Sequence, residues 1–226
     1  MTPVRKSASD LSTRDSIFNA AAKLFASSGF DGVSTDDIAR SANANKAMIY
    51  YHFADKLALY RAIVADGLKT MSEIAGSIAA SPATPSAKLD AFIEAFVRMT
   101  ETRPWMPAMM LREIAEGAPR LDPDTLAHMR AVIGNFGAIL KQGQTNGVFR
   151  PVHPILAYES IVGPIIINAA RERVAEQPAR KNQDSPLLAS ISHDEVIAHV
   201  QETARRMLAP ENADQPGPQQ AQKPTL

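Results

Sequence analysis

The feature that most constrains the fold of this 226-residue chain is the repeated pairing of a helix-capping residue with a following proline. Thr84-Pro85 and Asp122-Pro123 each put a capping side chain ahead of proline, whose fixed φ and missing N–H suit the first position of a helix. No stretch shows the sustained alternation of apolar and polar residues that a half-buried strand requires. The chain is therefore expected to be all-α.

The first helix is predicted to begin at Ser12 and to end at Gly29. Ser12 with Asp15 three residues later has the spacing of a capping box, in which each side chain accepts from the other residue's backbone N–H. Gly29 readily adopts the positive φ that commonly ends a helix. Between these ends, apolar residues at helical spacing define a buried face made of Ile17, Ala21, Leu24 and Phe25.

A second, short helix is predicted after Ser34, which forms another capping box with Asp37. Asn43 follows where the chain must turn sharply, and asparagine tolerates the left-handed conformation. The third and fourth helices are expected over about 45–53 and 55–80. The first three helices then form one compact unit.

This compact domain is assigned to 12–60, and a larger helical domain to 61–209. Ser192 with Glu195 adds a further capping box. Residues 210–226 are rich in proline, glutamine and alanine with little to bury, so a disordered tail is expected there. The helices of the larger domain are predicted over about 85–102, 105–117, 123–146, 153–175 and 192–208.

Composition excludes several classes of protein. Cysteine is absent, which excludes disulfides and cysteine nucleophiles and favours a reducing, cytoplasmic location. The N-terminus lacks the apolar core of a signal peptide, and the longest apolar run, 161–170, is too short for a membrane span, so no membrane partner is expected. No G-x-G-x-x-G, H-E-x-x-H or G-x-S-x-G motif occurs, and the histidines lack metal-ligand spacing. We expect neither an enzyme nor a bound metal or cofactor.

Charge is balanced overall but not locally. The 24 lysines and arginines equal the 24 acidic residues, so net charge argues neither for nor against nucleic acid. In the third helix and the residues on either side of it, however, Arg40, Lys46, Lys56 and Arg61 stand against Asp55 alone. A phosphate-binding face is expected in this part of the chain.

Residues 17–64 resemble, along their whole length, the DNA-binding domain of the TetR family of bacterial regulators. The strongest parts are AAAKLFASSGFDGVST at 20–35, DDIARSA at 36–42 and KAMIYYHFADKLAL at 46–59. The resemblance implies that the second and third helices form a helix-turn-helix, with the third in the major groove of double-stranded DNA. It also implies a ligand-responsive regulator, usually a repressor, that binds an inverted-repeat operator as a homodimer.

The resemblance further implies which residues contact DNA. In this family the third helix contacts bases or the adjoining sugar-phosphate, and the starts of the second and fourth helices contact phosphate. Phosphate contacts position the protein, whereas base contacts specify the site. The corresponding residues are Lys46, Ala47, Met48 and Tyr50 for the bases, Thr35 and Lys56 for phosphate, and Tyr50, Tyr51 and His52 for the family's aromatic-aromatic-His run.

Helical spacing supports this assignment, because Ile49 and Phe53 lie four residues apart and would face the core. Two positions depart from the family pattern: Asn43 stands where glycine is usual, and Met48 where a small or hydroxylated residue is common. The family's base preference is therefore not carried over. For Tyr51 and His52, packing is the alternative to DNA contact.

The larger domain is expected to bind a small apolar or aromatic effector. Flexible methionine thioethers suit an adaptable apolar cavity, and an ordinary core is the alternative for each of them. Arg112, Glu113 and His128 are the nearest polar groups in sequence, and we expect them at the surface or between helices. The candidate effector residues are Phe92, Phe96, Met99, Trp105, Met109, Met110, Met129 and Phe136.

The last two helices are expected to form the dimer interface. Each carries an apolar stripe at helical spacing, and two such helices from each subunit can form a four-helix interface around a two-fold axis. A helical protein that uses its helix-turn-helix only to dock another protein is the rival interpretation, and DNA binding with a steep salt dependence would separate the two. The stripes are Ile161, Ile165 and Ala169 on one helix and Ile197, Val200, Ala204 and Leu208 on the other.

Overall fold

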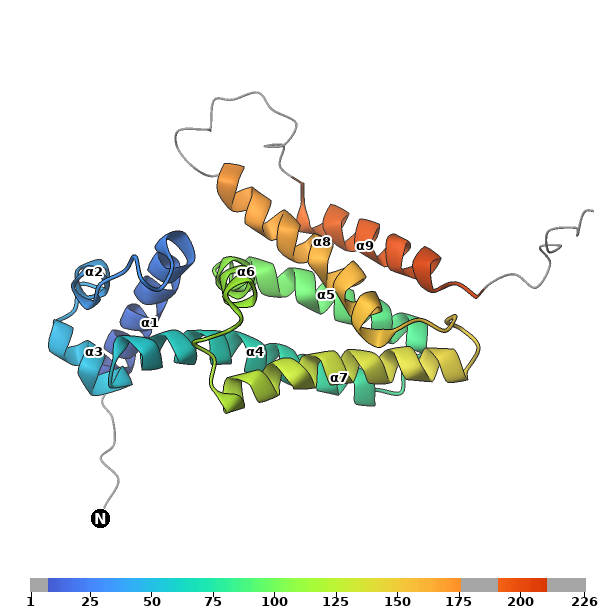
Figure 1. Ribbon diagram of the computed structural model, residues 1–226, viewed down its shortest axis with the longest axis horizontal. Helices are drawn as coiled ribbons and strands as arrows, with labels where there is room; N and C mark the ends of the chain where they lie inside the picture. The colour runs from blue at the N-terminus through green and yellow to red at the C-terminus, as the bar shows by residue number, and fades with distance from the viewer. Residues whose placement is uncertain (1–7, 176–190, 211–226) are drawn as a thin grey trace, which may run out of the picture.

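The computed structural model describes residues 8–175 and 191–210, and this part of the chain consists of nine helices without a strand (Figure 1). The all-α prediction is confirmed. Within these residues, no helix combines the length and apolarity needed to span a bilayer. The helices are α1 (Ala8–Ser28), α2 (Thr35–Ser41), α3 (Lys46–Phe53), α4 (Lys56–Ala80), α5 (Pro85–Thr102), α6 (Met106–Glu116), α7 (Pro123–Thr145), α8 (Pro154–Ala175) and α9 (His193–Leu208).

The predicted start of the first helix is wrong. α1 begins at Ala8, so Ser12 lies inside the helix and does not cap it. A serine inside a helix costs little helix propensity, so the helix extends through Ser12. Gly29 ends α1 with φ of 75°, as expected.

The predicted caps of α2, α5, α7 and α9 are confirmed. The Ser34 hydroxyl accepts from the Asp37 N–H at 3.1 Å, and the Asp37 carboxylate accepts from the Ser34 N–H at 3.0 Å. Ser192 and Glu195 form the same reciprocal box. Thr84 and Asp122 cap the helices that begin at the following prolines. Local sequence therefore sets where most helices begin.

Two tight turns position α3 between its neighbours. Asn43 adopts φ of 49° between α2 and α3, which is the left-handed conformation predicted from its side chain. Ala54, between α3 and α4, has φ of 65° and ψ of −56°, and the Asp55 N–H donates to the Phe53 carbonyl at 2.8 Å. This is a γ-turn of the strained type, and only Ala54 and Asp55 lie between the two helices. The end of α3 and the start of α4 are therefore held close together.

The remaining helices form an elongated body (Figure 1). α4 and α7 run side by side along its length, and α5 packs on both. α8 and α9 lie over α5 on the opposite side from α4. α6 packs against α1, α4 and α8, so it joins the α1–α3 unit to the rest of the molecule.

The core is divided into two apolar clusters. One contains Phe25, Ile38 and Ile49 from α1–α3, and it also includes Met106 and Met109 from α6. The other is built by the distal part of α4 with α5, α7, α8 and α9. α4 contributes to both clusters, and α6 completes the N-terminal one. These two helices therefore connect the two ends of the molecule through packed side chains.

The stripes assigned to a dimer interface lie inside the subunit. Six of the seven residues are at most 9% exposed in the single chain and belong to the cluster formed by α5, α7, α8 and α9. Their periodicity reflects packing within the chain, and whether these helices also meet a second subunit stays a prediction. The six residues are Ile161, Ile165, Ile197, Val200, Ala204 and Leu208, while Ala169 is half-buried. Residues 211–226 of the predicted tail lie outside the described residues.

Candidate nucleic-acid interface and internal cavity

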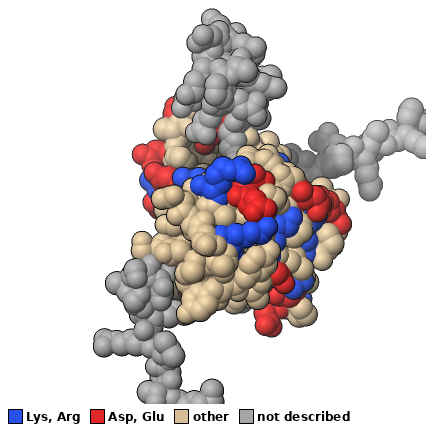
Figure 2. Space-filling model, turned by 90° about the vertical axis from the view of Figure 1, so that its left-hand side faces the viewer, with Lys and Arg blue, Asp and Glu red and all other residues tan. Residues whose placement is uncertain are grey.

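α3 buries one face and exposes the other. Ile49 is fully buried and Phe53 is 7% exposed, as the sequence predicts. Tyr50 and Tyr51 are 48% and 62% exposed, and Ala47 is exposed between them. Tyr51 therefore contributes little to the core. Figure 2 views the end of the molecule formed by α1–α3, where basic and acidic side chains are interspersed.

Two basic side chains of this end, Lys46 and Arg40, are paired with acidic residues of α2. Lys46 Nζ lies 2.8 Å from Asp36 Oδ2, and this hydrogen bond raises the pKa of Lys46. Arg40 Nη1 lies 3.0 Å from Asp37 Oδ1. Both pairs are exposed, so each contributes little to stability and can exchange an acidic partner for a phosphate. The α2–α3 surface therefore carries two cations, Arg40 and Lys46, whose acidic partners can be replaced by phosphate groups.

Lys56 has a structural contact that sequence reasoning did not foresee. Its ammonium donates to the carbonyls of Phe30 and Val33 at 3.1 and 2.9 Å, and it lies 4.2 Å from the centre of the Phe30 ring. These contacts fasten the start of α4 to the connection between α1 and α2. Lys56 stays a predicted phosphate contact, but it also holds the domain together.

The remaining predicted DNA contacts differ in burial. Thr35, at the first position of α2, and Met48 are half-buried. His52 is half-buried beside Tyr51, with their ring centres 4.9 Å apart. Neither ring nitrogen of His52 has a hydrogen-bond partner among the described residues. His52 therefore has a packing contact and unused hydrogen-bonding capacity.

A buried polar network joins α4 and α6. The Tyr60 hydroxyl donates to Glu113 Oε1 at 2.8 Å, and Arg120 Nη1 donates to the same oxygen at 3.0 Å. Glu113 is fully buried, and desolvation together with this carboxylate raises the pKa of Tyr60. Arg112 donates to the carbonyls at the end of α1. The prediction that Glu113 and Arg112 lie between helices is confirmed, and His128 is half-buried.

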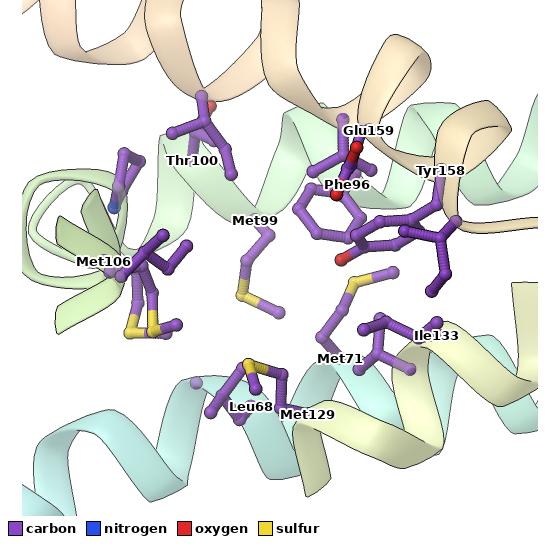
Figure 3. A pocket seen from close by; sticks show the side chains of 18 residues that line it. Leu68, Met71, Phe96, Met99, Thr100, Met106, Met129, Ile133, Tyr158 and Glu159 are labelled. Carbon is purple, nitrogen blue, oxygen red and sulfur yellow. The ribbon is translucent and has the colours of Figure 1, made fainter. Parts of the chain in front are cut away.

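A cavity of about 310 Å³ lies between α4, α5, α6, α7 and α8 (Figure 3). Its volume is at the lower end of the range for small-molecule pockets. Ile114 and Ile155 line it and are also exposed, so its mouth lies between α6 and α8. The lining residues are Gly67, Leu68, Met71, Phe96, Met99, Thr100, Met106, Pro107, Met110, Ile114, Met129, Val132, Ile133, Ile155, Tyr158, Glu159, Val162 and Ile166.

Half of the predicted effector residues line this cavity. Phe96, Met99, Met110 and Met129 do so. The other four do not line it: Phe92 and Phe136 belong to the core behind the wall, while Met109 and Trp105 pack with the N-terminal cluster.

The cavity-lining residues of α8 were not predicted from the sequence. Ile155, Tyr158, Val162 and Ile166 recur at helical spacing beside the stripe that was assigned to the dimer. This second apolar stripe is the sequence feature from which the α8 side of the cavity could have been predicted. A helix with two adjacent apolar stripes has two buried faces, and one of them here faces a cavity.

Two family models match the chain. Residues 17–63 match the bacterial regulatory proteins of the tetR family, and residues 85–200 match the tetracyclin repressor-like C-terminal domain. The second match alone spans half of the chain. The N-terminal match contains α2 and α3, including the exposed residues Ala47, Tyr50 and Tyr51.

Individual relatives agree with these matches. A biofilm operon HTH-type negative transcriptional regulator, IcaR of Staphylococcus aureus, is 47% identical over 47 residues, which is 21% of this chain and 25% of that protein. Its counterpart in Staphylococcus epidermidis is 44% identical over 48 residues, again about a quarter of its length (26%). The chain therefore matches only a quarter of these curated relatives.

Solved structures extend the similarity over most of the chain. The TetR family transcriptional regulator PfmR from Thermus thermophilus superimposes with a TM-score of 0.66 at 26% identity, over 84% of this chain and 97% of that one. The ketosteroid transcriptional regulator KstR2 of Mycobacterium tuberculosis has a TM-score of 0.71 at 19% identity, over 88% and 95%. The second likeness is one of fold alone.

Proposed function

Because the chain belongs to the TetR family of bacterial regulatory proteins, we propose that it is a ligand-responsive repressor: a homodimer that binds an inverted-repeat operator and releases it when a small apolar effector enters the cavity. One observation carries this proposal. α4 and α6 line the cavity and also pack into the cluster that holds α3. An effector that moves either helix would therefore be felt at the DNA-binding end.

The exposed face of α3 supports the DNA-binding part of the proposal. A recognition helix must bury one side and offer the other to base edges in the major groove. Ala47 and Tyr50 lie on the free side, and Lys46 needs only to leave Asp36 to reach a phosphate or a guanine. We propose base contacts for these three residues, and backbone contacts for Thr35 and Lys56.

The outer faces of α8 and α9 support a dimer through different residues from those first predicted. Leu156 and Ile167 on α8 are 62% and 64% exposed. A groove between α8 and α9 is lined by Pro164, His199 and Thr203, and also by three residues of the stripes first assigned to the interface, Ile161, Val200 and Ala204. Exposed apolar side chains next to a groove are typical of self-complementary interfaces around a two-fold axis.

The curated relatives are consistent with repression, because IcaR is described as a negative transcriptional regulator. The cavity of this chain is lined almost wholly by apolar side chains. We therefore propose an apolar effector and release of DNA on its binding.

Selection from randomised duplex DNA tests the proposal. The purified protein should retain one inverted-repeat sequence, with an affinity that falls steeply as salt rises. Adding an apolar extract of cell metabolites should release that DNA. Ala47→Glu is the matched control, because it adds a negative charge to an exposed position of α3 and should abolish retention without unfolding the protein. Retention of all sequences alike, by both proteins, would contradict the proposal.

A further inference from the structure

We propose that the cavity selects an effector without a negative charge, an apolar molecule whose single polar group is an oxygen that accepts a hydrogen bond from Tyr158, as in an ester, a ketone or an ether. The inference rests on the proposed function and names the chemical class of its ligand. It depends on three observations: the charges of the lining residues, the partners of Arg103 beside the lining, and the free donor inside the cavity.

The lining contains one charged side chain, and it is negative. Among the 18 described residues around the cavity there is no lysine, arginine or histidine, and Glu159 is the only acidic residue. Glu159 has no hydrogen bond or ion pair with another described residue that would neutralise it, and it lies at the exposed side of α8. A carboxylate or phosphate on the ligand would lose water without gaining a cation, and it would approach a like charge.

Arg103, which contacts the lining residue Met99, already has an acidic partner. Arg103 Nε lies 2.9 Å from Asp66 Oδ2, and its Nη2 donates to Thr70. Its other terminal nitrogen, Nη1, donates to the sulfur of Met99, a residue of the cavity lining, at 3.8 Å. An anion in the cavity would have to take this guanidinium from a carboxylate that is already in place.

The start of α6 offers an anion little either. A helix N-terminus binds anions through free backbone N–H groups. Here the Met106 N–H donates to the Arg103 carbonyl at 3.0 Å, and Pro107 has no N–H. Two successive positions at the end of α6 nearest the cavity therefore have no donor for a ligand.

Tyr158 supplies the free donor. Figure 3 shows its hydroxyl directed into the cavity beside Met71 and Phe96. No hydrogen bond joins this hydroxyl to another described residue, whereas the Thr100 hydroxyl donates to the Val97 carbonyl at 2.8 Å. Burial raises the pKa of Tyr158 to about 12, so at neutral pH the hydroxyl keeps its proton. A ligand that accepts this hydrogen bond removes the cost of an unpaired donor.

The ring of Tyr158 is held in this position by three phenylalanines. Its centre lies 5.6 Å from that of Phe136, 6.3 Å from Phe96 and 6.5 Å from Phe92, and all three contacts are edge-to-face. Phe92 and Phe136 thus act behind the wall, by orienting the residue that meets the ligand. The donor is preorganised, which favours selectivity for a ligand with an acceptor at one place.

Three probes with the same carbon skeleton test the inference: phenylpentanoate, its methyl ester, and pentylbenzene, which has no oxygen. Binding to the full chain is followed by calorimetry and by the fluorescence of Trp105, the only tryptophan. At neutral pH the ester should bind at least about tenfold more tightly than the carboxylate. Tyr158→Phe should weaken the ester about two- to tenfold and leave pentylbenzene unchanged.

Glu159→Gln is the second variant, and it should narrow the gap between ester and carboxylate because the like charge is gone. Carboxylate binding as tight as that of the ester would overturn the inference, as would an equal loss for ester and pentylbenzene in Tyr158→Phe. If the carboxylate is preferred and releases operator DNA, the inference fails while the proposed function stands. If none of the probes binds, the effector cavity itself is refuted, and both proposals fail.

Discussion

The hydroxyl of Tyr60 in α4 donates a 2.8 Å hydrogen bond to Glu113 Oε1 in α6, inside the molecule and between the cavity and the DNA-binding end. Arg120 completes the site from the connection that follows α6 and also reaches Asp31 in the connection between α1 and α2. One buried carboxylate therefore joins α4, α6 and the N-terminal domain. A buried charge is stable only while its partners remain, so this site fixes the relative positions of the three segments.

Removing the Tyr60 hydroxyl should destabilise the protein. Tyr60→Phe leaves the ring contacts with Phe25 and Phe30 in place but deprives a fully buried carboxylate oxygen of one donor. We expect a loss of about 1–3 kcal/mol in the free energy of unfolding, measured by urea denaturation. Tyr51→Phe is the control, because the Tyr51 side chain is 62% exposed. Equal effects of the two changes would show that the buried hydrogen bond contributes nothing.

Alanine variants of Lys56 and Lys46 should differ, because Lys56 has a structural role and Lys46 is proposed to contact a base. Lys56→Ala removes the donor to two carbonyls, so it should lower stability by about 1–3 kcal/mol and also weaken all DNA sequences about equally. Lys46→Ala breaks only an exposed ion pair and should change stability by less than about 1 kcal/mol. It should relax preference at particular base pairs instead. Thermal unfolding and affinities for a set of operator variants check both, and a uniform loss with Lys46→Ala would contradict the assignment of a base contact.

The dimer should depend on the outer face of α8 and not on its inner stripe. Replacing Leu156 and Ile167 together by glutamate puts charges on exposed apolar positions, so the protein should stay folded but elute as a monomer from a sizing column. Ile165→Glu buries a lone charge at a position that is 1% exposed, and it should cost about 3 kcal/mol or more of stability. A double variant that remains dimeric would show that the interface does not include the outer face of α8.

The α8 and α9 stripes mark the limit of what sequence periodicity reveals. The spacing of Ile165 and Ile197 correctly predicts that both are buried. Periodicity says nothing about whether the covering surface belongs to the same chain or to a second copy. The capping signals at Thr84 and Asp122 were confirmed because capping is decided within a few residues, whereas the partner of an apolar face is decided by the whole fold.

Adjacent methionines of α6 show the same limit at the cavity. Met110 lines the cavity, while Met109 packs with the N-terminal cluster and is 1% exposed. Neighbouring residues on a helix point in directions about 100° apart, so a rich run of methionines contributes to two clusters at once. The density of thioethers indicated a cavity in this region. The direction of each side chain required the positions of α4 and α8.

Gly67 should control the size of the cavity. A Cβ atom at this position would lie 2.8–2.9 Å from the side chain of Met106, which lines the cavity from α6. Gly67→Ala should push the flexible methionine end aside and weaken effector binding. Helix propensity, worth up to about 1 kcal/mol, offsets part of the strain, so stability should change little. Gly134→Ala, where nothing lies within 4 Å, should stabilise α7 and leave effector binding unchanged. Calorimetric titration with an effector distinguishes the two, and identical affinities would show that Met106 does not limit the cavity.

Arg112 should carry part of the coupling between effector and operator. Its guanidinium donates to the carbonyls of Phe25 and Ala26 at 2.9 and 2.8 Å, at the C-terminal end of α1, where a cation also meets the negative end of the helix dipole. Two residues away on either side, Met110 and Ile114 line the cavity. An effector that displaces these side chains would rotate or shift α6. The hydrogen bonds of Arg112 would then displace the end of α1 as well.

We therefore expect Arg112→Gln to bind both operator and effector but to respond less to the effector. A tenfold loss of operator affinity on effector binding corresponds to about 1.4 kcal/mol of coupling, and by linkage the operator must weaken the effector by the same factor. In the variant both factors should fall together towards one. Arg98→Gln, on α5 and paired with Asp194, is the matched control and should keep the full coupling. Undiminished coupling in Arg112→Gln would mean that the signal reaches α3 only through α4 and the tight turn at Ala54.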